Sequence, residues 1–211
     1  MSQFQINSIT DKSGTSGPVI AGVSTNNSTG CMIIPAGPTE HRGGRGRGVI
    51  GSGQLIPSGA VNTMNFITIA STGDATDFGD LSYGAAYRGG LASSTRGIFV
   101  NGQGDTTFDY VTISSQGGGV DFGEAITDHM GGATFNSSTR GFRAGGSDPS
   151  VSTPHTTDIM GMIIASTGSF FDAGDLTIVG TYQNGASSPT RGIIFGGTTP
   201  SAAYNLSLIH I

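Results

Sequence analysis

Short apolar runs of strand length alternate along this chain with polar segments rich in serine, threonine and glycine. Residues 47–53 (RGVIGSG) hold one such run and residues 64–71 (MNFITIAS) hold the next. Their β-branched and aromatic content is typical of a half-buried pleated strand. No stretch keeps a 3.6-residue apolar spacing between capping signals, so we expect essentially no long helix. The pattern predicts an all-β protein.

The same pattern returns at a fixed distance along the chain. An isoleucine is followed by an aspartate 8 residues later and by an arginine 19 residues after that, three times without insertion or deletion. The three sets are Ile69, Asp77 and Arg96; Ile113, Asp121 and Arg140; Ile164, Asp172 and Arg191. A fixed period of this kind indicates repeated units, each too small to bury a core alone.

Counted from arginine to arginine, beginning at Arg47, the units are 47–95, 96–139 and 140–190, with a partial fourth unit at 191–205. Each unit is expected to hold three or four short strands: the run after the arginine, the aromatic run, the segment around DFGDL, DFGEA or DAGDL, and the segment ending in SSTR or SPTR. A glycine lies six residues after each arginine, at Gly53, Gly102, Gly146 and Gly197.

Units of 44–51 residues with about four antiparallel strands fit the blades of a β-propeller. A β-solenoid coil is normally shorter, and a sandwich does not explain the exact repeat. Length varies within segments 54–63, 103–107 and 147–157, which predicts contact loops there. Because closed propellers have about 4–8 blades, either further sequence closes the ring or an open arc leaves edges that invite a homo-oligomer.

Residues 1–45 do not belong to the repeat. The runs FQINSI, PVIAGVST and GCMIIPAGP predict three strands of a small β-rich leader, an attachment or oligomerisation segment. The basic stretch 41–48 (HRGGRGRG) is either an RNA-binding segment or a linker, and the net charge of −5 with one lysine favours the linker and no nucleic-acid partner. The glycines at 46, 48 and 51 match the spacing of a dinucleotide-binding motif. That motif requires a strand before it and a helix after it, and neither is predicted here, so we reject it.

Composition limits the chemistry further. The single cysteine, Cys31, excludes an intrachain disulfide and is expected to be a small buried hydrophobe. No apolar run approaches about 18 residues, so no membrane span is predicted, and the N-terminus has no secretory signal. The histidines share no metal-ligand spacing. We therefore predict no catalytic residue, no metal ligand and no cofactor.

Two repeated residue types have a structural and a functional interpretation each. Each D-x-G-[DE] segment begins with an aspartate (Asp77, Asp121 or Asp172) and has a second acid three residues on. These acids either shape a turn by accepting hydrogen bonds from nearby backbone N–H groups or contribute to a calcium site. The arginines either form a bidentate ion pair with these aspartates or line a channel for an anionic sugar. We favour the structural interpretation of both.

The residues Arg191, Gly192, Gly196 and Gly197, followed in each unit by an aromatic strand, resemble a kelch-type blade, although the chain has no tryptophan. The segments ITIASTGDATDFGDL, SSTRG and INSITDKSGTSGPVIAG resemble sequences of repeat-bearing virion proteins of marine tailed bacteriophages. This resemblance implies a structural or adhesive part of the particle, in the tail or a fibre. It also implies other virion proteins as partners, contact with a host-surface glycan or protein, and release by host lysis.

The last six residues, 206–211 (LSLIHI), look like a translated sequencing adapter; the alternative is a natural apolar strand. From the sequence we expect a partial kelch-like propeller behind a leader, acting as a non-enzymatic virion protein. The alternative is a glycan-active, depolymerase-like enzyme on the same scaffold, which would need carboxylates that converge on one pocket.

Overall fold

The computed structural model describes residues 46–199, apart from 105, 126–127, 149–154 and 169, and the backbone of three two-residue strands. These are β1 (Ser24–Thr25), which pairs with β2 (Met32–Ile33), and β16 (Ile209–His210). The described residues form strands, turns and bends without a helix. The other leader residues, including Cys31 and most of the predicted leader strands, lie outside the described residues.

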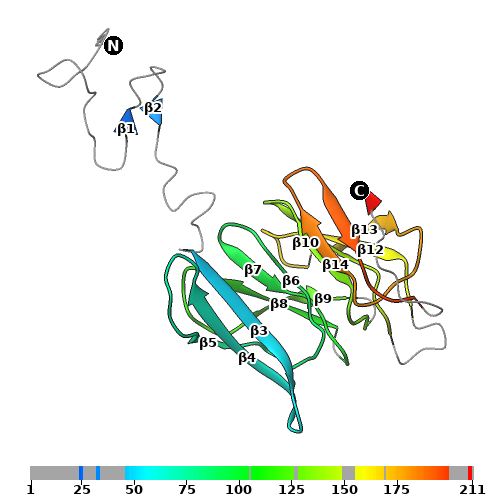
Figure 1. Ribbon diagram of the computed structural model, residues 1–211, viewed down its shortest axis with the longest axis horizontal. Coiled ribbons are helices and arrows are strands. Elements are labelled where there is room, and N and C mark those ends of the chain that lie inside the picture. The colour runs from blue at the N-terminus through cyan, green and yellow to red at the C-terminus, as the bar shows by residue number, and fades with distance from the viewer. Residues whose placement is uncertain are drawn as a thin grey trace, which may run out of the picture.

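Four antiparallel sheets follow one another in chain order, and each is a simple meander (Figure 1). We call them blades 1 to 4. Blade 1 contains β3 (Arg47–Leu55), β4 (Gly59–Thr68) and β5 (Thr76–Asp80). Blade 2 contains β6 (Gly90–Ala92), β7 (Arg96–Phe99), β8 (Thr107–Thr112) and β9 (Val120–Glu124). Blade 3 contains β10 (Ala133–Asn136), β11 (Arg140–Ala144), β12 (Asp158–Ile163) and β13 (Phe170–Asp175). Blade 4 contains β14 (Asn184–Ser187), β15 (Gly192–Phe195) and β16.

The predicted all-β, propeller-like architecture is confirmed, but the blades begin one strand earlier than the arginine-based units. The small-residue segment 90–92, placed at the end of unit 47–95, pairs with β7 of the next sheet, with Ala92 opposite Gly97. The same holds for β10 with β11 and for β14 with β15. The tight SSTR and SPTR turns connect strands within a blade, so the blades are divided in segments 81–89, 125–132 and 176–183 instead.

The first strands of blades 2, 3 and 4 lie next to one another, as the innermost strands of a propeller do. The Asn136 side-chain amide donates to the Ala92 carbonyl at 2.6 Å, and the Ser187 hydroxyl donates to the Asn136 carbonyl at 2.7 Å. Thr134 adds a further bond from its hydroxyl to the Gly90 carbonyl at 3.0 Å. Neighbouring blades are therefore joined near the axis through polar contacts.

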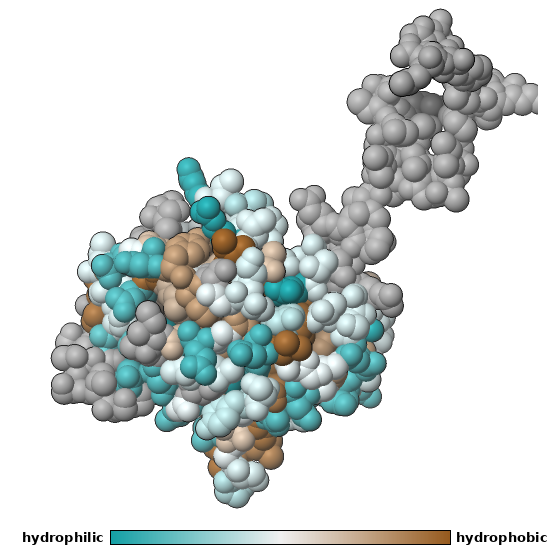
Figure 2. All heavy atoms as spheres, turned by 180° about the vertical axis from the view of Figure 1, so that it is seen from behind, coloured by the Kyte–Doolittle hydropathy of each residue, from teal (hydrophilic) through white to brown (hydrophobic). Residues whose placement is uncertain are grey.

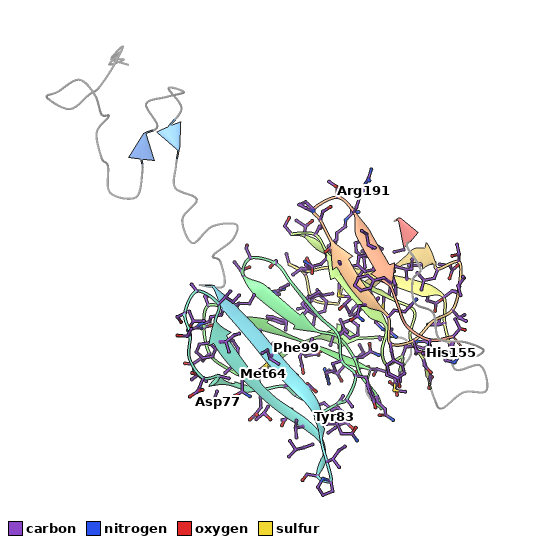
Figure 3. All side chains as sticks on the ribbon, viewed as in Figure 1. Met64, Asp77, Tyr83, Phe99, His155 and Arg191 are labelled. Carbon is purple, nitrogen blue, oxygen red and sulfur yellow. The ribbon has the colours of Figure 1, made fainter. Side chains whose placement is uncertain are left out.

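The hydrophobic core lies between the blades. Phe99 of blade 2 packs with Met64 and Phe78 of blade 1, and Figure 3 shows Met64 and Phe99 facing each other. Phe122 of blade 2 packs with Met162 of blade 3 in the next cluster. A third cluster joins blades 3 and 4. Each blade thus depends on its neighbours, as the repeat period predicted.

Candidate functional site

The two ends of the blades differ, and this difference locates the candidate site. We call the end with the SSTR and SPTR turns the turn end, and the opposite end the loop end. At the turn end the serine hydroxyl of each turn accepts the arginine N–H at 3.1 Å in all three copies. The pairs are Ser93 with Arg96, Ser137 with Arg140 and Ser188 with Arg191.

The aspartates of the repeat share one environment. Each precedes a β-bulge in the last strand of its blade. In blade 2 Phe122 is the extra residue, because Phe108 opposes Gly123 while Asp109 opposes Asp121. Register shifts occur at the corresponding places in blades 1 and 3. Asp121 and Asp172 each accept the N–H of the glycine two residues on, at 2.8 Å. The turn interpretation is confirmed for these two aspartates. The described part of the chain contains no cluster of three or more residues able to hold a metal ion.

The bulges also connect neighbouring blades. The N–H of Gly117 in blade 2 donates to the Phe78 carbonyl of blade 1 at 2.9 Å, and the N–H of Gly168 in blade 3 donates to the Phe122 carbonyl at 2.6 Å. Gly79 has a φ of +137°, and a side chain there would lie 2.5 Å from the Gly117 carbonyl oxygen. Glycine is required at this position by both its conformation and its neighbour.

The predicted ion pair between the repeat arginines and aspartates does not form. The Arg47 guanidinium lies 4.5 Å from the centre of the Phe66 ring and donates to the Ile113 carbonyl of blade 2 at 3.2 Å. Arg96 lies 4.1 Å from the Tyr110 ring centre and donates to the Ile164 carbonyl of blade 3 at 2.9 Å. These arginines therefore join adjacent blades through a cation–π contact and a backbone carbonyl.

Arg140 and Arg191 are exposed and line a cavity of about 200 Å³ between blades 3 and 4. Figure 3 shows Arg191 projecting from the molecule. Arg47 and Arg96 are engaged between blades, so the four arginines do not act alike. The alternative interpretation, a ring of equivalent arginines for an anionic sugar, therefore does not fit these four residues.

The glycines that follow the arginines by six residues lie toward the loop end, Gly53 at a register shift within β3 and the other three just after a strand. Gly53, Gly146 and Gly197 have φ values of +134°, +115° and +93°. A side chain at Gly102 would lie 2.4 Å from the Ala86 carbonyl oxygen. Conformation or close approach explains glycine at each of the four positions.

The three variable segments belong to the loop end, because each comes after the run that begins at a repeat arginine, in β3, β7 or β11. Segment 54–63 forms the tip of the β3–β4 hairpin, where Ile56 is 87% exposed, and the hairpin projects from the lower edge in Figure 2. The described residues of segments 103–107 and 147–157 follow β7 and β11, and His155 is at this end in Figure 3. Residues 105 and 149–154 of these two segments lie outside the described residues.

Two tyrosines stand at the loop end in an unusual conformation. Tyr87 and Tyr182 have φ values of +58° and +57°, and about half of each side chain is exposed. The equivalent residue of blade 3 is Gly131, with a φ of +66°. Left-handed backbone costs a non-glycine residue roughly 1–2 kcal/mol. Such strained residues cluster at functional sites.

Backbone hydrogen bonds hold these three positions in a row. Gly131 donates its N–H to the Tyr87 carbonyl at 3.3 Å, and Tyr182 donates its N–H to the Gly131 carbonyl at 2.7 Å. Because Gly131 has no side chain, the rings of Tyr87 and Tyr182 meet edge to face with their centres 5.5 Å apart. They border a cavity of about 490 Å³ that Arg88, Gln183 and Asn184 also line. Exposed aromatic rings beside amide and cationic groups suit a ligand with both apolar and polar faces, so this cavity is the candidate binding site.

A second cavity, of about 330 Å³, lies on blade 3 and brings together His129, Arg143, Asp158, Asp172 and Asp175. Burial lowers the pKa of Arg143 to about 10, while Asp128 and Asp158 oppose that shift, so Arg143 stays charged at neutral pH. It donates to the His129 carbonyl at 2.8 Å. Two of the three carboxylates already accept structural bonds, Asp172 from Gly174 and Asp175 from the Thr157 hydroxyl.

No protein-family model and no curated protein matches this sequence. The chain is similar to a solved structure described as the structure of YjhT, a kelch-like β-propeller, with 14% identity and a TM-score of 0.57. The match covers 72% of this chain and 50% of that chain, so this protein spans about half of the YjhT propeller. The likeness establishes the fold.

The tyrosine pair was not predicted from the sequence. Its signal was the alignment of Tyr87, Gly131 and Tyr182 nine residues before a repeat arginine in blades 2, 3 and 4, because glycine in one copy points to a left-handed conformation at this position. Among the described residues no helix is long and apolar enough to cross a membrane.

Proposed function

We propose that this protein is a non-enzymatic structural or adhesive component of a bacteriophage particle, and that the loop end of its propeller contacts a host surface or another virion protein. The virion assignment rests on the resemblance of the repeat and leader sequences to those of phage virion proteins. The contact surface is supported by one observation above all: two half-exposed tyrosines held together in strained backbone at the loop end.

The turn end supplies the contrast that supports this choice. Its repeated serines and bulge glycines, together with the side chains of Arg47 and Arg96, bond within a blade or to the next blade, so these groups serve assembly. The rings of Tyr87 and Tyr182 contact mainly each other and solvent, beside the variable loops. Binding residues are commonly found on variable loops that a rigid scaffold positions.

A binding experiment tests the contact surface. The purified protein is applied to an array of bacterial surface glycans and to whole host cells, together with a Tyr87→Ala/Tyr182→Ala variant. We expect the wild type to bind and the double variant to lose at least tenfold in affinity. Tyr83→Ala is the matched control, since Tyr83 is equally exposed but lies outside the pair. Equal binding by all three proteins would contradict the site.

The virion assignment has its own test. Peptides of this protein are expected in the mass spectra of purified particles of a phage that carries the gene, at several copies per particle. Their presence in the lysate and absence from washed particles would contradict a virion role, and would leave the binding result standing.

A glycan-active enzyme is the second candidate, and the cavity that contains Asp158, Asp172 and Asp175 is the feature that favours it. Hydrolysis would release new reducing ends from a bound glycan, and the release would stop in an Asp158→Asn variant. Binding without such release supports the non-enzymatic function.

A further inference from the structure

The cavity beside the tyrosine pair has a lining that restricts the ligands it can take. Of the eleven residues that line it, five are glycines and two are the tyrosines. The other four are polar: Arg88, Thr134, Gln183 and Asn184. These described residues include no valine, leucine, isoleucine or methionine and no carboxylate. An apolar side chain of a protein partner would need an apolar pocket, and here the two rings supply the only large apolar surfaces.

Glycine keeps the floor of this cavity free of side chains. Gly89 lies just before β6 and Gly185 lies in β14, on either side of Thr134 in β10. A side chain at Gly89 would collide with the Thr134 side chain, and one at Gly185 would collide with the Thr134 carbonyl group. The first strands of blades 2, 3 and 4 therefore approach closely here, and their backbone forms a floor on which a flat ligand can lie.

The tyrosines supply an apolar wall above this floor. Tyr87 is 47% exposed and Tyr182 is 49% exposed. Their ring planes meet at 64°, so the edge of one ring covers part of the other and the remaining ring surface faces solvent. The face of an aromatic ring is electron-rich and attracts C–H groups that neighbouring oxygen atoms polarise. A pyranose sugar has such C–H groups on its ring face and hydroxyl groups around its rim.

The polar lining matches those hydroxyl groups. Asn184 is exposed and Gln183 is half-buried at the cavity. Each side-chain amide offers hydrogen-bond donors and an acceptor, and each sugar hydroxyl likewise donates and accepts. A ligand that stacks on the rings can therefore bond these amides through its rim.

The charged group of the lining is turned away from a ligand. Arg88 donates from Nη2 to the Tyr83 carbonyl at 3.1 Å, and its Nε and Nη1 atoms are shielded from solvent. An anionic sugar would need an accessible guanidinium fork for its carboxylate. A cationic ligand would need an acid, and none of the described lining residues is acidic. The lining thus favours an uncharged ligand.

We infer that this cavity binds an uncharged sugar ring, which stacks on the tyrosine pair and bonds through its hydroxyl groups to the amides of Gln183 and Asn184. The inference rests on the proposed function, because it names the class of ligand at the same contact surface. It narrows that function from host surfaces in general to neutral glycans.

The first test varies the ligand and leaves the protein unchanged. Saturation-transfer NMR is run on residues 1–211 with neutral trisaccharides of glucose, galactose, mannose and N-acetylglucosamine. The comparison ligands are a galacturonic acid trimer and a proline-rich peptide, since such peptides also dock on aromatic side chains. We expect transfer to at least one neutral trisaccharide, strongest at the C–H protons of one ring face. No transfer to any neutral sugar, or tighter binding of the acidic trimer or the peptide, would overturn the inference.

Variants then locate the bound sugar. Tyr182→Leu removes a ring and Asn184→Ala removes an amide, and we expect affinity for the sugar to fall about tenfold and about fivefold. Tyr83→Ala is the control and should keep the wild-type affinity, because the Tyr83 side chain is exposed and does not line the cavity. Circular dichroism checks that each variant is folded. Wild-type affinity in both folded cavity variants would overturn the inference.

Host attachment is measured separately, so the two claims can fail independently. Neutral-sugar binding by a protein that attaches neither to host cells nor to phage particles would contradict the proposed function and leave the inference standing. Attachment to host cells that an excess of the neutral trisaccharides does not reduce, together with no transfer in the NMR test, would overturn the inference and leave the proposed function standing.

Discussion

The turn end and the loop end of the propeller are built on different principles. At the turn end blades 2, 3 and 4 share one serine–arginine hydrogen bond, which has the same length in all three copies. At the loop end the segments differ in length, although the blades share a left-handed residue there that is tyrosine in two blades and glycine in a third. Repeated side-chain contacts therefore hold the turn end together, and the variation in segment length lies at the loop end.

The largest effect should come from the bulge core. Phe122→Ala removes a ring that is 1% exposed and packs between blades 2 and 3, so we expect unfolding free energy to fall by about 3–5 kcal/mol. Val120→Ala, in the same strand but half-exposed, should cost no more than about 0.5 kcal/mol. Urea denaturation measures both. Similar losses would mean that this bulge does not anchor the blades.

A matched glycine pair sharpens the comparison. Gly79 and Gly174 occupy equivalent bulge positions with positive φ, but only Gly79 lies against the next blade. Gly79→Ala should destabilise the protein by about 1–3 kcal/mol more than Gly174→Ala, since the new methyl group meets the Gly117 carbonyl. Equal melting-temperature changes in the two variants would show that strain alone, without the blade contact, sets the cost.

The arginines allow a milder test at the turn end. Arg96→Lys keeps the charge but loses the planar stacking on Tyr110, so we expect a loss of about 1 kcal/mol. Arg140→Lys, at the equivalent exposed position, should change stability by less than about 0.5 kcal/mol. Calorimetry of both variants measures the difference, and the reverse order would contradict the assembly role of Arg96.

The smallest effect is expected at the loop end. Tyr87→Gly removes the strain of the left-handed backbone, roughly 1–2 kcal/mol, and also an aromatic contact of about 0.5–1.5 kcal/mol, so stability should change little. Tyr87→Ala loses the contact and keeps the strain, and should be about 1 kcal/mol less stable than Tyr87→Gly. If the glycine variant were the less stable one, the tyrosine would be a framework residue.

Much of the fold could be predicted because the repeat period, the β-rich runs and the glycines leave direct traces in the sequence. The hydrogen-bond acceptors of the repeat arginines could not be predicted. One arginine and one aspartate per unit at fixed spacing suggest an ion pair, but the acceptors are the backbone carbonyls of Ile113 and Ile164, and every residue carries such a group. The blade boundary was placed one strand late because the arginine is conspicuous, whereas the chain changes sheets within segments such as 81–89.

The bond from Arg47 to Ile113 spans 66 residues, and that from Arg96 to Ile164 spans 68. During synthesis from the N-terminus, the first arginine therefore gains its acceptor only after most of the second blade has left the ribosome. Blades 1 and 2 are each fastened by the blade that emerges after them. The blades are therefore fixed in the order in which they are translated, and the most recently synthesised blade stays without its arginine contact until the next blade follows.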